Sequence, residues 1–307
     1  METIRWRNFE LSRMMLGTVQ LGMQYGIANR RGQPDYPQAL EMVRTALEGG
    51  VNSFDTAASY GVSEQVLGRA ISDLGASERV VVVTKIRVLT EEEREDKVQG
   101  KRAVEASVTE SQSRLKLDCL PIVLFHREAD AVRYMDVLDG LRKKGRVRFI
   151  GVSCDNRPGR ASEFLKDQRI SALQLSASVL DRRYDKSGIL DRAGECRTAI
   201  FVRSVFLQGL LVMPMESIPR SLEKALPVRR SLERIGEESG ITLPEMAIRY
   251  MLGGKGVTSV LTGVETVEQI RENVQIFGRG PLPSDVVSAI DAAVPVLPEA
   301  ILTPSMW

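Results

Sequence analysis

The chain has 307 residues, 43% hydrophobic and 27% charged, a size that fits two ordinary domains or one α/β barrel. Its 42 basic residues nearly balance 40 acidic ones, and a formal charge of +2 favours neither nucleic acid nor an anionic membrane as partner. No basic leader and no run of roughly 18 apolar residues is found, and the three cysteines are widely spaced. We therefore expect a cytoplasmic protein with a small-molecule partner.

Eight short apolar runs rich in branched residues recur along the chain. Most are nearly continuous in apolar character, as expected of strands buried on both faces, and most are separated by segments with helical spacing. They span residues 15–19, 51–54, 80–84, 119–125, 147–152, 172–175, 199–202 and 257–261. This alternation predicts an α/β fold of the (β/α)8 TIM barrel type rather than a doubly wound sheet, with one domain over residues 1–307.

The segments between the runs carry helix signals. Residues 37–49 place their apolar side chains on one face and end at two glycines, which predicts an amphipathic helix with a glycine stop. After the third run, Thr90 is followed three residues later by Glu93, a capping-box pattern. We interpret the acidic run 91–97 as a solvated helix face.

Two pieces flank the repeats. Residues 4–11 are expected to form an N-terminal β-hairpin around Arg7-Asn8 that covers the bottom of the barrel, and a C-terminal helical tail from Ser284 onward is long enough to reach the top. No G-x-G-x-x-G follows a strand and no P-loop motif occurs. A nucleotide would have to be held in another way.

Titratable residues stand at the carboxyl ends of three neighbouring predicted strands, where barrels of this type carry their catalytic groups. Asp55 follows the second strand, Lys85 the third, and His126, the single histidine of the chain, the fourth. Tyr60 lies five residues beyond Asp55 in the same loop. Taken singly, each also fits a structural role, as a helix cap, an ion-pair partner, a carbonyl ligand or a rim aromatic. Together they predict one catalytic site at the barrel mouth.

The chemistry of these four residues is complementary. A tyrosine, with an ordinary pKa of about 10, is a poor acid at neutral pH, but a neighbouring ammonium group stabilises the phenolate and lowers that pKa. Asp55 would hold Lys85 charged and aimed at the Tyr60 hydroxyl, while His126 would bond a substrate oxygen. Such a set protonates an oxygen that gains negative charge, as a carbonyl oxygen does when its carbon receives hydride.

At these residues the sequence resembles the aldo-keto reductase superfamily. The segment 50–68 resembles the family signature around its aspartate and tyrosine, and residues 83–85, 123–126 and 150–153 resemble its lysine, histidine and fifth strands. Similarity runs from about residue 16 to residue 273. The resemblance implies that Tyr60 donates the proton, that Lys85 and Asp55 tune it, that His126 orients the carbonyl, and that NAD(P)H, in most members NADPH, supplies hydride.

The resemblance also implies a cofactor that lies extended across the barrel top. Ser153 and Gln174 would bond the nicotinamide amide, residues 204–209 would form the loop under the pyrophosphate, and residues 263–273 would embrace the adenosine end. The full set of expected cofactor contacts is Thr18, Val19, Asp55, Ser153, Gln174, Arg203, Ser204, Phe206, Gln208, Gly209, Gly263, Glu265, Thr266, Gln269 and Asn273.

Two residues depart from the family pattern. Arg203 stands where many members stack an aromatic ring on the nicotinamide; a guanidinium can also stack, and its charge would favour the reduced cofactor. Glu265 stands where members selective for NADPH commonly have a basic residue. A carboxylate there would repel the 2′-phosphate and accept bonds from ribose hydroxyls, so we predict a weak NADPH preference or a lean toward NADH. Arg271 and Lys255 are alternative sources of the missing positive charge.

The long loop of residues 20–29, with Arg182, Arg183 and Tyr184 after the sixth strand, is expected to line a polar pocket suited to a sugar-like or anionic carbonyl. Alternatively, the two arginines are rim charges that aid solubility. We predict an NAD(P)H-dependent oxidoreductase that reduces such an aldehyde or ketone, with no metal. Two alternatives stay open. One is a redox-silent nucleotide-binding regulatory protein, and the other is a lyase or isomerase that uses Lys85 as a Schiff-base nucleophile. The sequence carries no signal for an oligomeric state.

Overall fold

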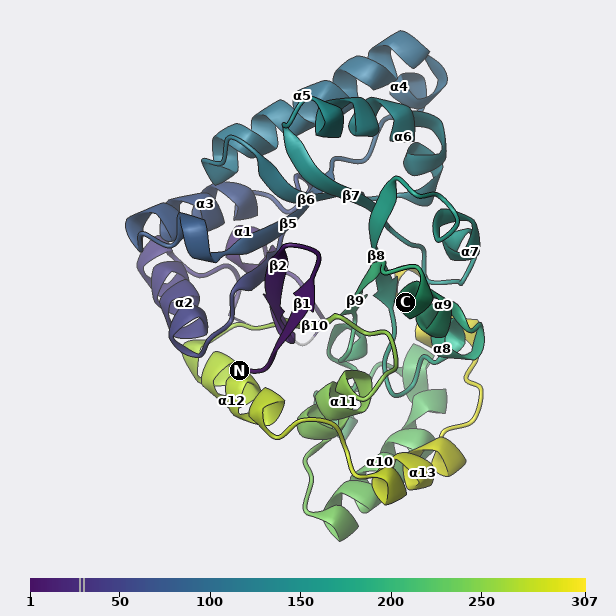
Figure 1. Cartoon of the computed structure of the whole chain (residues 1–307). Helices are drawn as coiled ribbons and strands as arrows, with labels where there is room; N and C mark the ends of the chain where they lie inside the picture. Colours follow the sequence, from purple (N-terminus) through teal and green to yellow (C-terminus); the bar gives the residue numbers. More distant parts are fainter. Residues whose placement is uncertain (28, 30) are drawn as a thin grey trace.

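Parallel strands close into an eight-membered barrel in the computed structural model, which describes residues 1–27, 29 and 31–307 (Figure 1). In chain order the strands are β3 (Met14–Gly17), β4 (Ser53–Asp55), β5 (Val81–Ile86), β6 (Leu120–Phe125), β7 (Val147–Ser153), β8 (Ile170–Ser176), β9 (Ala199–Arg203) and β10 (Ser259–Gly263). Strand β10 pairs with β3 and completes the ring. The predicted (β/α)8 fold is confirmed.

All eight strands lie within two residues of the predicted runs at each end, and the first and last show why the bounds differ. The first run was expected to continue to Val19, but the chain turns into the short helix α1 (Val19–Gly22) after Thr18, whose hydroxyl donates to the carbonyl oxygen of Asp55 at 2.9 Å. The last strand starts two residues later than predicted. The side chain of Arg13 donates to the carbonyl oxygens of Val257 and Thr258, and these two residues precede the β10 ladder.

Helices surround the ring and follow the strands in alternation (Figure 1). The longer ones are α2 (Tyr36–Glu48), α3 (Ser63–Asp73), α5 (Lys97–Leu115), α6 (Glu128–Lys143), α10 (Leu226–Ser239), α11 (Leu243–Leu252) and α12 (Val267–Gly278); the short ones are α4 (Glu91–Glu95), α7 (Ala161–Phe164), α8 (Arg183–Lys186) and α9 (Ile189–Glu195). The predicted capping box at Thr90 and Glu93 is present at the start of α4. The acidic run 91–97, however, is not one helix face, because Asp96 ends α4 and caps α5 by accepting from two backbone amides.

The N-terminal hairpin forms as predicted and closes the amino-terminal end of the barrel. Strands β1 (Thr3–Trp6) and β2 (Phe9–Ser12) pair around a turn in which Arg7 adopts a left-handed φ of 54°. Trp6 packs against Phe149 with ring centroids 4.8 Å apart, and its indole N–H donates to the carbonyl of Arg197 at 3.2 Å. The hairpin lies across the ring in Figure 1.

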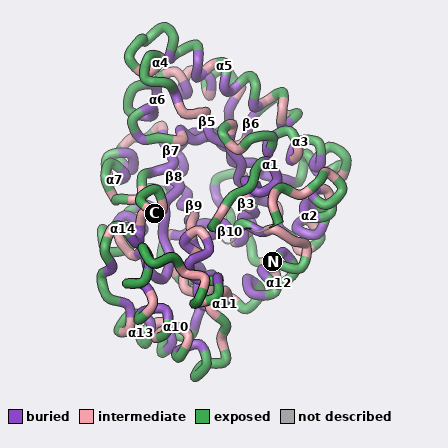
Figure 2. Tube along the Cα trace, turned by 180° about the vertical axis from the view of Figure 1, so that it is seen from behind, coloured by how far each residue is buried: buried purple, intermediate pink, exposed green. Residues whose placement is uncertain are grey.

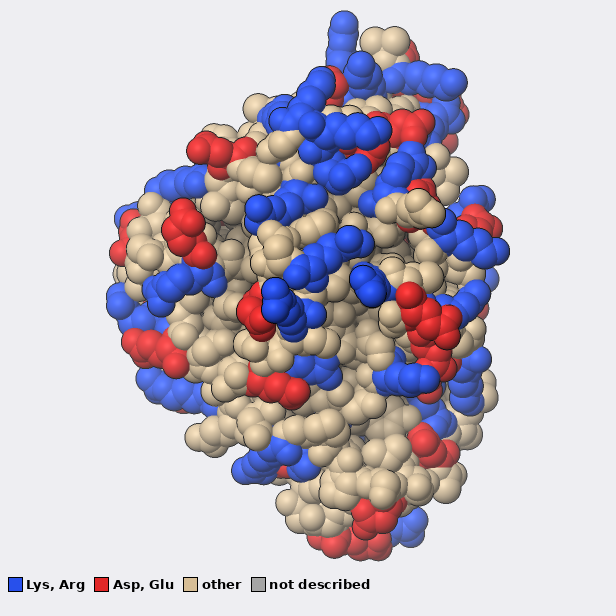
Figure 3. Space-filling model, in the orientation of Figure 1, with Lys and Arg blue, Asp and Glu red and all other residues tan. Residues whose placement is uncertain are grey.

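The face of the molecule that carries the hairpin is rich in lysine and arginine. Figure 3 shows these side chains around the hairpin and over the helices above it, with acidic groups between them. Helices α5 and α6 end with Arg114, Arg142 and Lys143 in their last turns. Basic residues at helix carboxyl ends interact favourably with the helix dipole, and these three residues are placed to do so.

The C-terminal tail comprises α13 (Ser284–Ala293) and α14 (Glu299–Leu302) and reaches the opposite end of the barrel, seen in Figure 2. Arg157, in the loop after β7, donates to Glu299 at 2.6 Å. Arg182 donates to Asp291 at 2.7 Å, and Arg183 donates to the carbonyl of Leu302 at 3.0 Å. The tail is therefore fastened to the loops that follow β7 and β8. Among the described residues, no helix has both the length and the apolar character needed to cross a membrane.

Candidate active site

A buried ion pair forms the base of the site. Lys85, near the end of β5, is 1% exposed, and its ammonium lies 2.8 Å from each carboxylate oxygen of Asp55, the last residue of β4. The ammonium also donates to the carbonyl of Thr56 at 2.9 Å, and Gln174 on β8 donates to Asp55 at 2.7 Å. Burial lowers the pKa of Lys85, but Asp55 and Tyr60 together raise that pKa above its ordinary value. Lys85 is therefore charged at neutral pH.

Tyr60 is positioned by close backbone packing. A Cβ atom on Gly22 would lie 2.0 Å from the carbonyl oxygen of Tyr60, so only glycine allows α1 to approach the Tyr60 loop this closely. The Lys85 ammonium lies 4.9 Å from the centroid of the Tyr60 ring. The structure corrects one expectation: burial raises the pKa of Tyr60, and the lowering by Lys85 only partly offsets this effect. The phenol is therefore held protonated at neutral pH.

His126 directly follows β6 and contacts Tyr60. The two rings meet edge to face, with centroids 5.7 Å apart and an interplanar angle of 83°. Burial and the charges of Lys85, Arg203 and Arg127 lower the pKa of His126 to about 3, so the imidazole is neutral. Its buried Nδ1 has no hydrogen-bond partner among the described residues. Nδ1 therefore does not bond a nearby backbone carbonyl in the described part of the chain.

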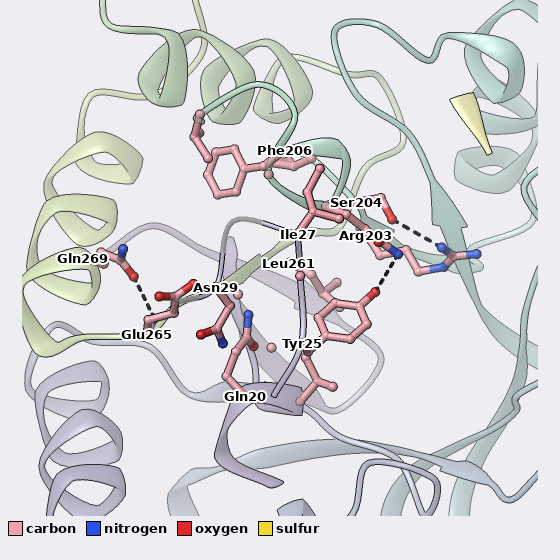
Figure 4. A pocket seen from close by; sticks show the side chains of 18 of the residues that line it. Gln20, Tyr25, Ile27, Asn29, Arg203, Ser204, Phe206, Leu261, Glu265 and Gln269 are labelled. Carbon is pink, nitrogen blue, oxygen red and sulfur yellow. Dashed lines mark hydrogen bonds between the residues drawn. The ribbon is translucent and has the colours of Figure 1, made fainter. Parts of the chain in front are cut away.

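A cleft of about 760 Å³ opens beside these residues (Figure 4). Thirteen of the predicted cofactor residues line it, namely Thr18, Val19, Asp55, Gln174, Arg203, Ser204, Phe206, Gln208, Gly209, Gly263, Glu265, Gln269 and Asn273, together with Tyr60. Ser153 is buried beside Gln174 in the β7–β8 pair but is not part of the lining. Thr266 is not part of it either, because its hydroxyl caps α12 by accepting from the backbone of Gln269.

The loop after β3 lines the same cleft from the other side. We predicted that this loop lines a substrate pocket. The structure places four of its residues in the same cleft as the expected cofactor residues, namely Gln20, Tyr25, Ile27 and Asn29. The Tyr25 hydroxyl accepts from Gln208 Nε2 at 3.2 Å, which links the two walls of the cleft (Figure 4). The length of the loop was the signal in the sequence. Ala28, in the same predicted loop, lies outside the described residues.

The opposite wall carries unusual backbone conformations. Ser204, Leu207 and Gln208 have φ angles of 65°, 46° and 51°, in the left-handed region that non-glycine residues rarely adopt. Such conformations persist only where the surrounding structure imposes them, and they concentrate at ligand sites. No residue pattern in the sequence indicates them.

The other residues expected at the substrate pocket are engaged elsewhere, so that prediction is wrong for them. Arg183 pairs with Asp181 at 2.7 Å, besides its bond to the tail, and Arg182 is held by the tail as described above. Tyr184 is fully buried, and its hydroxyl donates to the carbonyl of Arg157 at 2.7 Å. None of the three lines the cleft. The two arginines are structural anchors rather than free rim charges.

Arg203 and Glu265, the two residues that depart from the family pattern, both line the cleft and have charged or polar neighbours. Arg203 donates to the carbonyl of Cys154 at 3.0 Å and to Asn156 at 3.2 Å while still lining the cleft. Burial raises the pKa of Glu265, whereas Arg31 lowers it. Lys255 pairs with Asp191 at 3.0 Å. Among the described residues, Arg31 is the cation whose charge acts on the Glu265 carboxyl, whereas Arg271 acts on that of Glu268.

Gln174 offers a buried acceptor to a group that binds in the cleft. Gln174 Oε1 is buried and has no donor among the described residues, although Gln174 Nε2 is fixed on Asp55. An amide oxygen fixed in this way beside Tyr60 can accept from the carboxamide N–H of a nicotinamide. Residues 1–27, 29 and 31–307 contain no group of three or more His, Cys, Asp or Glu side chains placed to hold a metal ion.

Comparison with known proteins agrees with this geometry. The model of the Aldo/keto reductase family matches residues 13–295. The chain is 24% identical over 303 residues to "Uncharacterized oxidoreductase YqkF" of Bacillus subtilis (strain 168), covering 93% of each protein, and 26% identical over 296 residues to "NADH-specific methylglyoxal reductase" of Escherichia coli (strain K12), covering 86% of this chain and 89% of that protein. The solved holo form of aldo-keto reductase AKR11C1 from Bacillus halodurans shares the fold, with a TM-score of 0.79 at 23% identity over 97% of each chain. The chain is an oxidoreductase of the aldo/keto reductase family.

Proposed function

We propose that the enzyme reduces an aldehyde or ketone to an alcohol, with NAD(P)H as hydride donor and Tyr60 as proton donor. One observation carries the proposal: at the cleft, a phenol that burial keeps protonated contacts both a buried ammonium and a neutral imidazole. This arrangement provides a proton together with a fixed positive charge near the point where a carbonyl oxygen becomes negative.

The four residues have separate roles in this reaction. Bound NAD(P)H supplies the hydride that the carbonyl carbon accepts. Tyr60 transfers its phenol proton to the carbonyl oxygen as that oxygen gains charge, which completes the alcohol. The Lys85 ammonium, held by Asp55, stabilises the phenolate until water returns a proton to it. His126 is neutral and orients the carbonyl by hydrogen bonding to its oxygen.

The ion pair also argues against the Schiff-base alternative. A Schiff base requires an unprotonated amine, whereas Lys85 is charged and its ammonium donates to Asp55 and Thr56. Borohydride trapping with a carbonyl substrate tests this point, and we expect no adduct at Lys85. A trapped adduct would favour a lyase or isomerase.

We further propose a lean toward NADH and a small, polar, sugar-like carbonyl substrate. Glu265 offers a carboxylate that accepts bonds from ribose hydroxyls and repels a 2′-phosphate, and a relative is named an NADH-specific methylglyoxal reductase. Titrations of the protein with NADH and NADPH compare the two affinities directly. Tenfold tighter binding of NADPH than of NADH would overturn the proposed lean toward NADH. It would indicate that the positive charge of Arg31 outweighs the negative charge of Glu265.

The reaction itself is tested by absorbance at 340 nm with NADH or NADPH and a panel of small aldehydes and ketosugars. We expect turnover by the natural protein and a loss of at least about a hundredfold in kcat for Tyr60→Phe, with cofactor affinity retained. Tyr36→Phe is the matched control, because Tyr36 bonds Asp73 on the outside of the barrel. Cofactor binding without turnover across the panel would instead support the redox-silent regulatory protein.

A further inference from the structure

Gln20 has a buried polar group that no protein group satisfies. It lies in α1 directly after β3, is 9% exposed and lines the cleft. Its Oε1 is buried and has no hydrogen-bond donor among residues 1–27, 29 and 31–307. Leaving such an acceptor unpaired lowers folding stability, so the group requires an explanation other than packing.

Gln20 packs against the backbone of β10 while it lines the cleft. Gly263, at the end of β10, lies against the amide: a Cβ atom there would be 2.7 Å from Gln20 Nε2. In Figure 4, Gln20 lies on the cleft floor between Glu265 and Tyr25, near Asn29. The side chain therefore lies next to Gly263 and Glu265, at the proposed adenosine end, and extends the lining toward Tyr25.

The missing partner must be a hydrogen-bond donor. An amide oxygen only accepts, and the diphosphate of a dinucleotide at neutral pH offers no proton. Apart from the carboxamide and adenine N–H groups at the two ends of the molecule, its donors are the hydroxyls of the two riboses. A ribose hydroxyl is the donor that matches a position between Glu265 and Tyr25.

We propose that Gln20 is a cofactor-binding residue whose Oε1 accepts a hydrogen bond from a ribose hydroxyl of the dinucleotide. The proposal rests on the proposed function, since it requires a dinucleotide in this cleft. It adds a contact at the start of the loop after β3, beyond the residues expected from the family pattern. It also explains why an unsatisfied amide is retained at this position.

The test combines ligand affinity with stability in the absence of ligand. Gln20→Met removes the unpaired acceptor at similar volume, so the ligand-free protein should melt at a higher temperature while NADH and ADP-ribose bind roughly three- to tenfold more weakly. Gln20→Asn keeps a buried amide but withdraws its oxygen, so affinity should fall without a gain in melting temperature. Gln24→Met is the matched control, because Gln24 is exposed in the same loop, and it should change neither quantity.

The outcomes separate this proposal from the function on which it rests. If Gln20→Met binds both AMP and NADH more weakly, the hydroxyl belongs to the adenosine ribose. If it binds NADH and ADP-ribose more weakly but AMP equally well, the hydroxyl belongs to the other ribose. Natural protein that binds neither NADH nor NADPH would overturn the proposed function and this inference together. Natural protein that binds NADH while both variants bind it equally well would overturn the role of Gln20 alone.

Discussion

Replacement of Asp55 by asparagine removes the counter-charge of a fully buried ammonium group. The two charges are 2.8 Å apart, which corresponds to about 6 kcal/mol of attraction at an effective dielectric constant of about 20. The asparagine carbonyl and Thr56 still accept from Lys85, so we expect a net loss of about 3–5 kcal/mol in the free energy of unfolding. For 307 residues this corresponds to a fall of about 5–8 °C in Tm.

A double-mutant cycle isolates the electrostatic part of this loss. The variant Asp55→Asn with Lys85→Met has neither charge, so it should be more stable than Asp55→Asn alone. The assay is equilibrium denaturation at pH 7 without ligand. Glu41→Gln is the control, because the Glu41–Arg44 pair is largely exposed and should contribute about 0–1 kcal/mol. A double variant as unstable as the sum of the single variants would refute the reasoning.

Three further results are expected. Because the pKa of His126 is lowered to about 3, the single imidazole NMR signal should not titrate between pH 7 and 4, and a midpoint near 6.5 would contradict this. Below about pH 6.5 the unfolded chain binds a proton at this imidazole and the native state does not. The free energy of unfolding should therefore decrease as the pH is lowered from about 6.5 to 3. Denaturation at each pH should show a smaller decrease for His126→Gln. Gly22→Ala should destabilise the protein by about 1–3 kcal/mol and reduce kcat, because its methyl group would displace the Tyr60 carbonyl. Gly140→Ala, in α6 with open space around it, should instead gain about 0.5–1 kcal/mol, and equal effects in the two variants would disprove the packing argument.

The barrel strands were predictable because both of their faces are buried. Strand β5, for example, is buried at every position, so its sequence is nearly continuous in apolar residues. The start of β10 was not predictable from that pattern. Val257 is as apolar as the strand itself, and only the contact with Arg13, 244 residues away in the chain, shows that it precedes the ladder.

The candidate site was likewise predictable only in part. Asp55, Lys85 and His126 are at or next to strand ends, so their grouping followed from the topology once the strands were placed. The pairing of Arg182 with the tail was not visible in the sequence, because a charged residue after a strand looks the same whether it faces a pocket or an aspartate 109 residues away. The net effect of burial on Tyr60 also requires coordinates, since burial and Lys85 change its pKa in opposite directions.

The fastening of the tail has a consequence for the order in which the molecule is completed. Every cleft-lining residue precedes Ser284. Asp291 and Glu299, the partners of the arginines that follow β7 and β8, come after all of them in the chain and are synthesised later. During synthesis the cleft can therefore assemble before the loops beside it have their anchors. The loops that follow β7 and β8 gain these anchors only after residues 291 and 299 have been synthesised.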